Sequence, residues 1–182
     1  MKLSDMKLDS VKDPVEKRLA FLAWLTQRVK EAGASSSPVL VGGGAVEFYT
    51  AGNYATKDID IVFGNIDMLN SILLPEGFIR EGRYWYNEGF DILVECPGSD
   101  YPAKITEVDV NGIKVMITAI EEITVDRLCA AKFWQSAKDL EWAKVMLKSG
   151  LPINLDYLRQ RAGDEDVSDT LDTAFGADRD KQ

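Results

Sequence analysis

The segment from Pro38 to Phe63 constrains the fold more than any other part of the sequence. Its apolar start predicts a short buried strand over 39–41, and three consecutive glycines predict a turn at 42–44. A short helix is expected from 45 to about 50, followed by a second strand over 58–63. An order of strand, glycine turn, helix and strand predicts an α/β fold.

The second of these strands opens with two acids, Asp58 and Asp60. Side chains two residues apart in a strand point to the same face, so these carboxylates are expected to project together. Neighbouring carboxylates repel each other unless water, a proton or a cation relieves them. Mg²⁺ prefers oxygen ligands and commonly uses one or two carboxylates plus substrate phosphates. The pair is therefore a candidate metal site, with a solvated strand start as the alternative.

Two motifs in this segment resemble the nucleotidyltransferase superfamily, which includes DNA polymerase beta, the antibiotic nucleotidyltransferases and the minimal nucleotidyltransferases. Gly42–Ala45 is similar to the Gly-Gly-x-Ala form of its turn, and Thr56–Ile61 to its Thr-x-Asp-Ile-Asp-Ile strand. Tyr54 stands where many relatives have Arg. Residues 124–132 and 138–143 are also similar to a pair of helices in uncharacterised minimal members of the superfamily. Together these segments extend the resemblance over roughly residues 38–148. It implies an α/β (α+β) fold, with helices flanking a mixed sheet and a C-terminal helical bundle.

The resemblance implies a site in which three acids hold two Mg²⁺ ions, or Mn²⁺ in their place. Asp58 and Asp60 match the family's pair, and the third acid is expected on a neighbouring strand. Asp91 is predicted for that role because it is the acid inside the apolar stretch 90–94. The runner-up is Asp109, beside a predicted Asn-Gly turn. Asp91 could instead simply face water.

The nucleotide triphosphate is expected at the glycine turn, because Gly42, Gly43 and Gly44 let backbone amides approach a phosphate closely. A purely structural turn is the alternative. Thr56 of the acidic-strand motif is assigned to the same site. The basic candidates for phosphate contacts are Lys57, Arg127, Lys132 and Lys138, of which Lys57 and Lys132 are preferred. A solvated lysine on a helix surface is the alternative for Lys132.

Composition excludes several other functions. The formal net charge of −9 argues against general nucleic-acid binding, which depends largely on Lys and Arg. The chain has no histidine, which excludes histidine-based triads and histidine zinc sites. Apolar runs are too short for a membrane span, and the N-terminus does not have the pattern of a signal peptide. We therefore expect a cytoplasmic protein with free thiols at Cys96 and Cys129.

The expected organisation is a nucleotidyltransferase-like α/β core with an N-terminal helix over 1–118, helices packed on it over 119–162, and an acidic mobile tail over 163–182. At most one helical turn is expected in the tail, around Leu171.

Two functions remain open. The first is an enzyme that moves an NMP group from an NTP to a hydroxyl of a small molecule or protein by a two-metal mechanism. The second is a non-catalytic member of the fold, such as a toxin–antitoxin component or a nucleotide sensor. A complete carboxylate triad in one cleft favours the enzyme. The sequence names neither the nucleotide base nor the acceptor.

Overall fold

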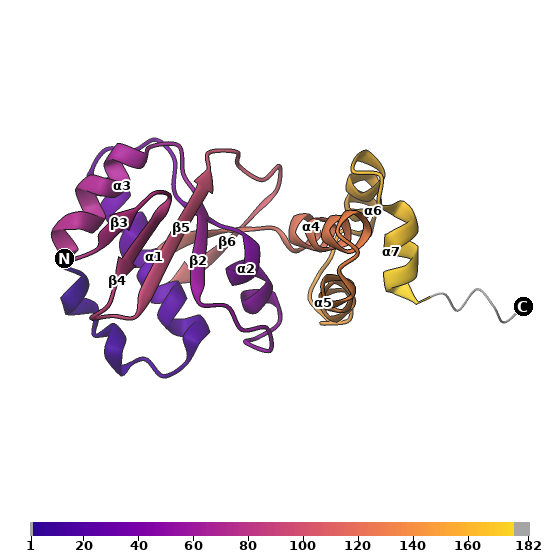
Figure 1. Cartoon of the computed structure of the whole chain (residues 1–182), viewed down its shortest axis with the longest axis horizontal. Coiled ribbons are helices and arrows are strands. Elements are labelled where there is room, and N and C mark those ends of the chain that lie inside the picture. Colours follow the sequence, from indigo (N-terminus) through magenta and orange to yellow (C-terminus); the bar gives the residue numbers. More distant parts are fainter. Residues whose placement is uncertain (1, 177–182) are drawn as a thin grey trace, which may run out of the picture. The chain divides into compact units, whose positions relative to one another are not determined.

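A computed structural model of the chain describes residues 2–176. The chain divides into two compact units, Met1–Thr118 and Ala119–Gln182, and each is described here by itself. The first unit is the sheet-containing part of Figure 1, and the second contains α4 to α7. Within the described residues, no helix combines the length and the apolar character needed to cross a membrane.

The first unit contains a mixed seven-stranded sheet in the order β3-β4-β5-β2-β1-β7-β6. Its strands are β1 (Val39–Leu40), β2 (Asp58–Val62), β3 (Ile79–Glu81), β4 (Tyr84–Asn87), β5 (Ile92–Gly98), β6 (Ile105–Val110) and β7 (Ile113–Thr118). Strand β2 pairs antiparallel with β1 and parallel with β5. The strands predicted around residues 39–41, 58–63 and 90–94 are therefore neighbours, which confirms the predicted α/β class.

Helices of the first unit are α1 (Pro14–Glu31), α2 (Gly42–Tyr49) and α3 (Ile66–Leu73), with 3₁₀ turns at Leu3–Met6, Leu8–Ser10 and Leu74–Glu76. Helix α1 begins where the sequence favours it, because the Asp13 carboxylate accepts the Glu16 N–H at 2.8 Å and Pro14 is the first helical residue. Its apolar stripe, which includes the fully buried Phe21 and Trp24, forms part of the core. The helix packs against β7 and α3.

The second unit is a helical bundle of α4 (Ile120–Phe133), α5 (Ala137–Leu147), α6 (Leu155–Asp164) and α7 (Ser168–Phe175). One buried apolar cluster joins these helices, with Leu128 and Leu158 fully buried in it. Asn154 caps α6 by accepting the Tyr157 N–H at 3.0 Å.

The structure differs from the predicted mobile tail over residues 163–176. Helix α7 occupies most of this segment, and Val167, Leu171 and Ala174 are buried in the core of the second unit. Their spacing places them on one face of the helix, while Asp169 and Asp172 are exposed. The acidic composition therefore describes the solvated face only. Residues 177–182 of the predicted tail lie outside the described part of the chain.

Candidate active site

The three glycines form the first turn of α2, which begins at Gly42 rather than at the predicted residue 45, and they place this end of the helix against the acidic strand. Gly42 has a φ of +53°, a conformation that favours glycine, and a Cβ at this position would lie 2.4 Å from Asp60 Oδ2. The next residue, Gly43, donates its backbone N–H to the same oxygen at 3.1 Å. A side chain at position 42 would therefore strain the backbone and push the Asp60 carboxylate away from the first turn of α2.

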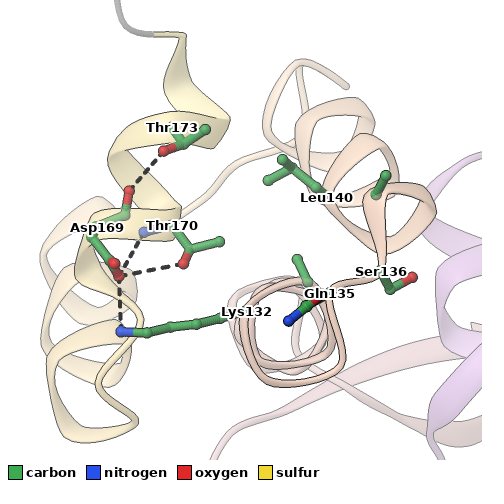
Figure 2. A pocket seen from close by; sticks show the side chains of 9 residues that line it. Lys132, Gln135, Ser136, Leu140, Asp169, Thr170 and Thr173 are labelled. Carbon is green, nitrogen blue, oxygen red and sulfur yellow. Dashed lines mark hydrogen bonds and ion pairs between the residues drawn. The ribbon is translucent and has the colours of Figure 1, made fainter.

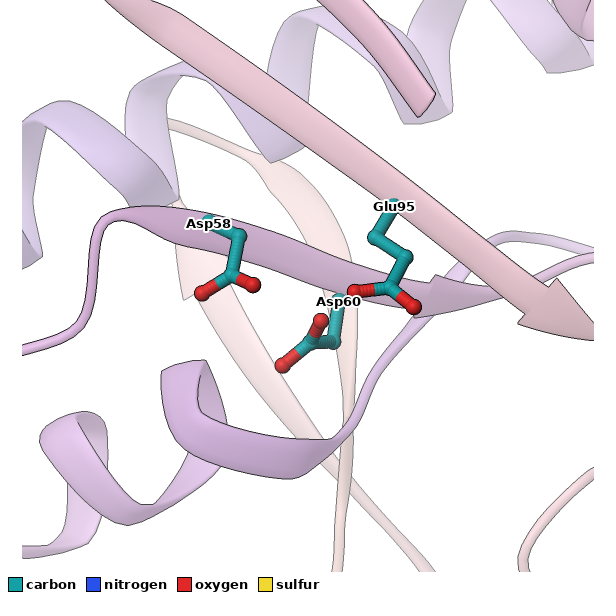
Figure 3. A group of neighbouring side chains, drawn as sticks. All are labelled: Asp58, Asp60 and Glu95. Carbon is teal, nitrogen blue, oxygen red and sulfur yellow. The ribbon is translucent and has the colours of Figure 1, made fainter. Parts of the chain in front are cut away.

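Strand pairing brings a third carboxylate to the two aspartates. In the parallel β2–β5 pair, Asp58 lies opposite Leu93 and Asp60 lies opposite Glu95. Each of Asp58, Asp60 and Glu95 offers a carboxylate oxygen, and these three oxygens lie within 4.8 Å of one another. Figure 3 shows the three side chains on one side of the two strands, near the first turn of α2. We call these three residues the carboxylate cluster.

Asp91, predicted as the third acid, lies outside this cluster, and the prediction that it sits inside a strand is wrong. The turn that follows β4 continues through Asp91, whose N–H is donated to the Glu88 carbonyl at 3.2 Å. Asp91 has a φ of +48° and is exposed, and β5 begins only at Ile92. At about 3.3 Å per residue, the start of β5 is roughly 10 Å before Glu95.

Glu95 was not predicted as a site residue, although apolar and polar residues alternate along β5 in the sequence. Ile92, Val94 and Cys96 are buried, and Glu95 lies between the last two. Asp109, the runner-up, is on β6, where its carboxylate accepts the Gly112 N–H at 3.0 Å in the predicted Asn-Gly turn.

The electrostatics of the cluster centre on Asp60. Burial, with smaller contributions from Asp58 and Glu95, raises the pKa of Asp60 to about 6, against the opposing hydrogen bond from the Gly43 N–H. The main cause is the removal of this carboxylate from water, and the neighbouring acids add to it.

Arg83 supplies a cation at the exposed side of the cluster. Its Nε lies 2.8 Å from Glu95 Oε1, and its side chain is 57% exposed whereas that of Glu95 is 12% exposed. The guanidinium also lies over the Tyr84 ring, 5.4 Å from the centroid. Glu95 and Tyr84 raise the pKa of Arg83 above its ordinary value, with the Tyr84 hydrogen bond as the main cause. Arg83 can therefore leave Glu95 for another anion without crossing the core.

Thr56 and Arg18 hold the other end of the cluster. The Thr56 hydroxyl donates to Asp58 Oδ1 at 2.5 Å, and Arg18 donates to the Thr56 carbonyl at 3.2 Å. Arg18 also forms a buried ion pair with Glu47 of α2. Burial lowers the pKa of Arg18, and the charges of Asp58 and Asp60 oppose that change. Lys57 is exposed next to this group.

Lys132 belongs to the second unit, where it has partners from its own bundle. Figure 2 shows its ammonium group, from α4, directed at Asp169 of α7, with Nζ 3.1 Å from Oδ1. The Asp166 carbonyl accepts a further hydrogen bond from it. The hydrogen bond with Asp169 is the main cause that raises the pKa of Lys132. The structure thus gives Lys132 a role in joining α4 to α7, and its nucleotide contact stays a prediction.

The donor set of the carboxylate cluster suits a hard divalent cation. All three ligand atoms are carboxylate oxygens, which Mg²⁺ and Mn²⁺ accept, whereas soft metals prefer sulfur and nitrogen ligands. A cation bound here would also oppose the effects of burial and of Asp58 that raise the pKa of Asp60. Asp58, Asp60 and Glu95 therefore fit a magnesium site.

Two neighbouring strands of a mixed sheet, joined by a short glycine-initiated helix and with the acids on the second strand, define the nucleotidyltransferase-like fold.

Neither a protein-family model nor a curated protein matches the chain. Among solved structures, the chain is similar to an antigenic nucleotidyltransferase-like protein from Paracoccidioides brasiliensis, with a TM-score of 0.58 and 19% identity over 88% of this chain and 93% of that one.

Two structures of the antibiotic-resistance factor ANT(2″)-Ia are also similar. The complex with adenylyl-2″-tobramycin has a TM-score of 0.52 and 17% identity over 81% of this chain and 95% of that one. The solution structure has a TM-score of 0.50 and 19% identity over 96% of this chain and 98% of that one. At these identities the likeness establishes the fold, in agreement with the resemblance of the two sequence motifs.

Proposed function

We propose that this protein is a nucleotidyltransferase that moves an NMP group from an NTP to a hydroxyl group of a second substrate. The observation that supports this most strongly is the carboxylate cluster, in which Asp58, Asp60 and Glu95 lie on one face of β2 and β5 beside the glycine turn. Arg83, Thr56 and Gly43 each contact one of these acids, and a divalent cation would relieve the remaining repulsion among all three.

Each acid has a proposed role. Asp58, Asp60 and Glu95 would hold the divalent metal, with Asp58 and Asp60 contributing to both ions of a two-metal site and Glu95 to one of them. Such ions would polarise the α-phosphorus and lower the pKa of the attacking hydroxyl. Gly43 fixes the orientation of Asp60 through its N–H, and the N-terminal turn of α2 favours the negatively charged phosphates.

The acceptor is proposed to be a small molecule, with a protein side chain as the second option. The similar ANT(2″)-Ia structure contains adenylyl-2″-tobramycin, a small molecule that carries a nucleotidyl group. The same fold therefore accommodates such a product. For this chain, the choice of nucleotide and the metal, Mg²⁺ or Mn²⁺, belong to the same proposal.

The test is an incubation of the protein with each α-³²P-labelled NTP, Mg²⁺ and cell extract, followed by separation of labelled products. We expect label transfer from the wild type and from Glu81→Gln, an exposed residue of β3, and loss of transfer in Glu95→Gln, which keeps the size of the side chain but removes its charge. Nucleotide binding without transfer by the wild type would favour the non-catalytic sensor or toxin–antitoxin component. Absence of Mg²⁺-dependent NTP binding would contradict both functions.

A further inference from the structure

A cavity of about 580 Å³ opens in the first unit beside the N-terminal ends of β2 and β5. Its walls come from the start of α1, the residues before each of these strands, and Tyr86 of β4. Ile59 and Leu93 give it an apolar wall. Cavities of this size commonly bind small molecules, with a few polar groups that set the ligand's chemistry.

The polar lining is mainly cationic, in a chain whose net charge is −9. Asp91 is the acid in the lining, and the basic side chains are Lys12, Lys17, Arg18 and Lys57. An excess of cations around a partly enclosed space attracts anions, and the apolar wall strengthens that attraction by excluding water.

Two of these cations are anchored. Lys17 donates to the Phe90 carbonyl at 2.6 Å, and an ammonium group has three donors, so this bond leaves donors for a ligand. Arg18 is 7% exposed and is held by its ion pair with Glu47 and its hydrogen bond to the Thr56 carbonyl, so the lysines are the cations that can turn to a ligand.

The cavity is connected to the carboxylate cluster by two residues. Thr56 lines the cavity and donates its hydroxyl hydrogen to Asp58. Leu93 also lines it and lies opposite Asp58 in the strand pairing, two residues before Glu95. Two residues of a strand span about 7 Å, so a small molecule in the cavity can extend to the cluster.

We propose that this cavity is the acceptor site, and that the acceptor carries a phosphate or carboxylate group that binds Lys12, Lys17 and Lys57. The proposal rests on the proposed nucleotidyl transfer. The acceptor's hydroxyl then reaches the carboxylate cluster beyond Thr56. Its oxygen forms a bond to the α-phosphorus of the NTP as the bond from that phosphorus to the bridging oxygen breaks. Pyrophosphate leaves with the electron pair, and the hydroxyl proton passes to water.

The test is an NMR titration of the ¹⁵N-labelled full chain with glycerol 3-phosphate, without metal or NTP, and with glycerol as the uncharged comparison. We expect saturable chemical-shift changes at the amides of Tyr86 and Leu93 with glycerol 3-phosphate and none with glycerol. The double variant Lys12→Gln/Lys57→Gln should bind at least about tenfold more weakly, the loss expected when charged hydrogen bonds are removed. The control Lys30→Gln/Lys148→Gln changes the net charge equally and should bind within about twofold of wild type.

One variant separates the anion site from the nucleotidyl transfer. Asp60→Asn should keep glycerol 3-phosphate binding and lose Mg²⁺–NTP binding.

Three results of the titration would overturn the anion site: equal binding of glycerol, shifts confined to other amides, or an equal loss of affinity in the control variant. A tenfold loss of Mg²⁺–NTP affinity in the Lys12/Lys57 variant, or label transfer to uncharged or cationic acceptors only, would overturn the acceptor role. If Mg²⁺–NTP does not bind the wild type, the nucleotidyl transfer fails, and with it the acceptor role, while the titration still decides the anion site.

Discussion

Replacing Asp60 by Asn tests the electrostatics of the carboxylate cluster without any ligand. Burial and the charges of Asp58 and Glu95 raise the pKa of Asp60 from 3.8 to about 6. The native state therefore binds more protons than the unfolded state between these values, and its stability falls as pH rises through them. The contribution of Asp60 is fully present below about pH 4 and is lost above about pH 6.

The magnitude follows from the same pKa. A change from 3.8 to about 6 corresponds to roughly 3 kcal/mol, at about 1.36 kcal/mol per pH unit. Solvent screens a half-buried carboxylate, which reduces the effect to about 1–2 kcal/mol. In Asp60→Asn the amide oxygen can still accept the Gly43 N–H, so the charge is the main property that changes.

The assay is urea unfolding in EDTA from pH 4.5 to 8, followed by tryptophan fluorescence. Trp134 and Trp142 are replaced by Phe in every variant, so that the signal reports Trp24 and Trp85 of the first unit.

At pH 7.5, Asp60→Asn should be more stable than its parent by about 1–2 kcal/mol, and the difference should shrink towards pH 4.5. Asp91→Asn, an equal charge change at an exposed residue outside the cluster, should stay within about 0.5 kcal/mol of its parent. A stability difference for Asp60→Asn that does not change with pH, or destabilisation at every pH, would show that Asp60 is not held in an unfavourable charged state.

Three further predictions concern other parts of the molecule. Gly42→Ala should lower the free energy of unfolding by about 2–4 kcal/mol in urea, because it strains a positive φ and places a Cβ against the Asp60 carboxylate. Arg83→Gln should tighten the binding of Mn²⁺ alone about two- to fivefold by calorimetry, because Glu95 loses a competing cation. Leu171→Ala should destabilise the second unit by about 2–4 kcal/mol, measured by circular dichroism, because it opens a cavity in the buried cluster.

Each of these has a matched control. Gly112 also has a positive φ, but no atom lies near an added Cβ, so Gly112→Ala should lower the free energy of unfolding by about 1 kcal/mol. An equal loss of stability at both glycines would mean that the contact with Asp60 is not the cause. Arg80→Gln removes a cation that lies over Trp85, and equal tightening there would show a general charge effect. Asp172→Ala, on the exposed face of α7, should change stability by less than about 0.5 kcal/mol. An unchanged stability of Leu171→Ala would mean that α7 contributes nothing to the bundle.

The part of the site that the sequence predicts comes from one short segment of the chain. Asp58 and Asp60 share a face because of the alternation within one strand, and Gly42 is required by the turn that precedes it, so both follow from a short segment. Glu95 depends on the register between β2 and β5, which the whole sheet determines. Asp91 has the same parity as Glu95 in the sequence, but it lies in the turn before β5, where the alternation of a strand does not apply.

The fold was predictable to a similar extent. The order of elements predicted the neighbouring central strands, because apolar runs and glycine turns are strong local signals. Helix α7 was not predicted because its buried residues, Val167, Leu171 and Ala174, are only three apolar positions within an acidic segment. Only the bundle that buries these residues makes the helix favourable, and such tertiary packing is not visible in local composition.

The proposed metal site is tested most directly by a crystal structure of the protein with Mn²⁺ and a non-hydrolysable NTP analogue, with anomalous diffraction used to locate the metal. We expect Mn²⁺ at about 2.0–2.3 Å from carboxylate oxygens of Asp58, Asp60 and Glu95, with the triphosphate bound to the same ion beside the first turn of α2. Anomalous density away from this cluster, or a bound analogue whose triphosphate does not contact a metal held by these three residues, would contradict it.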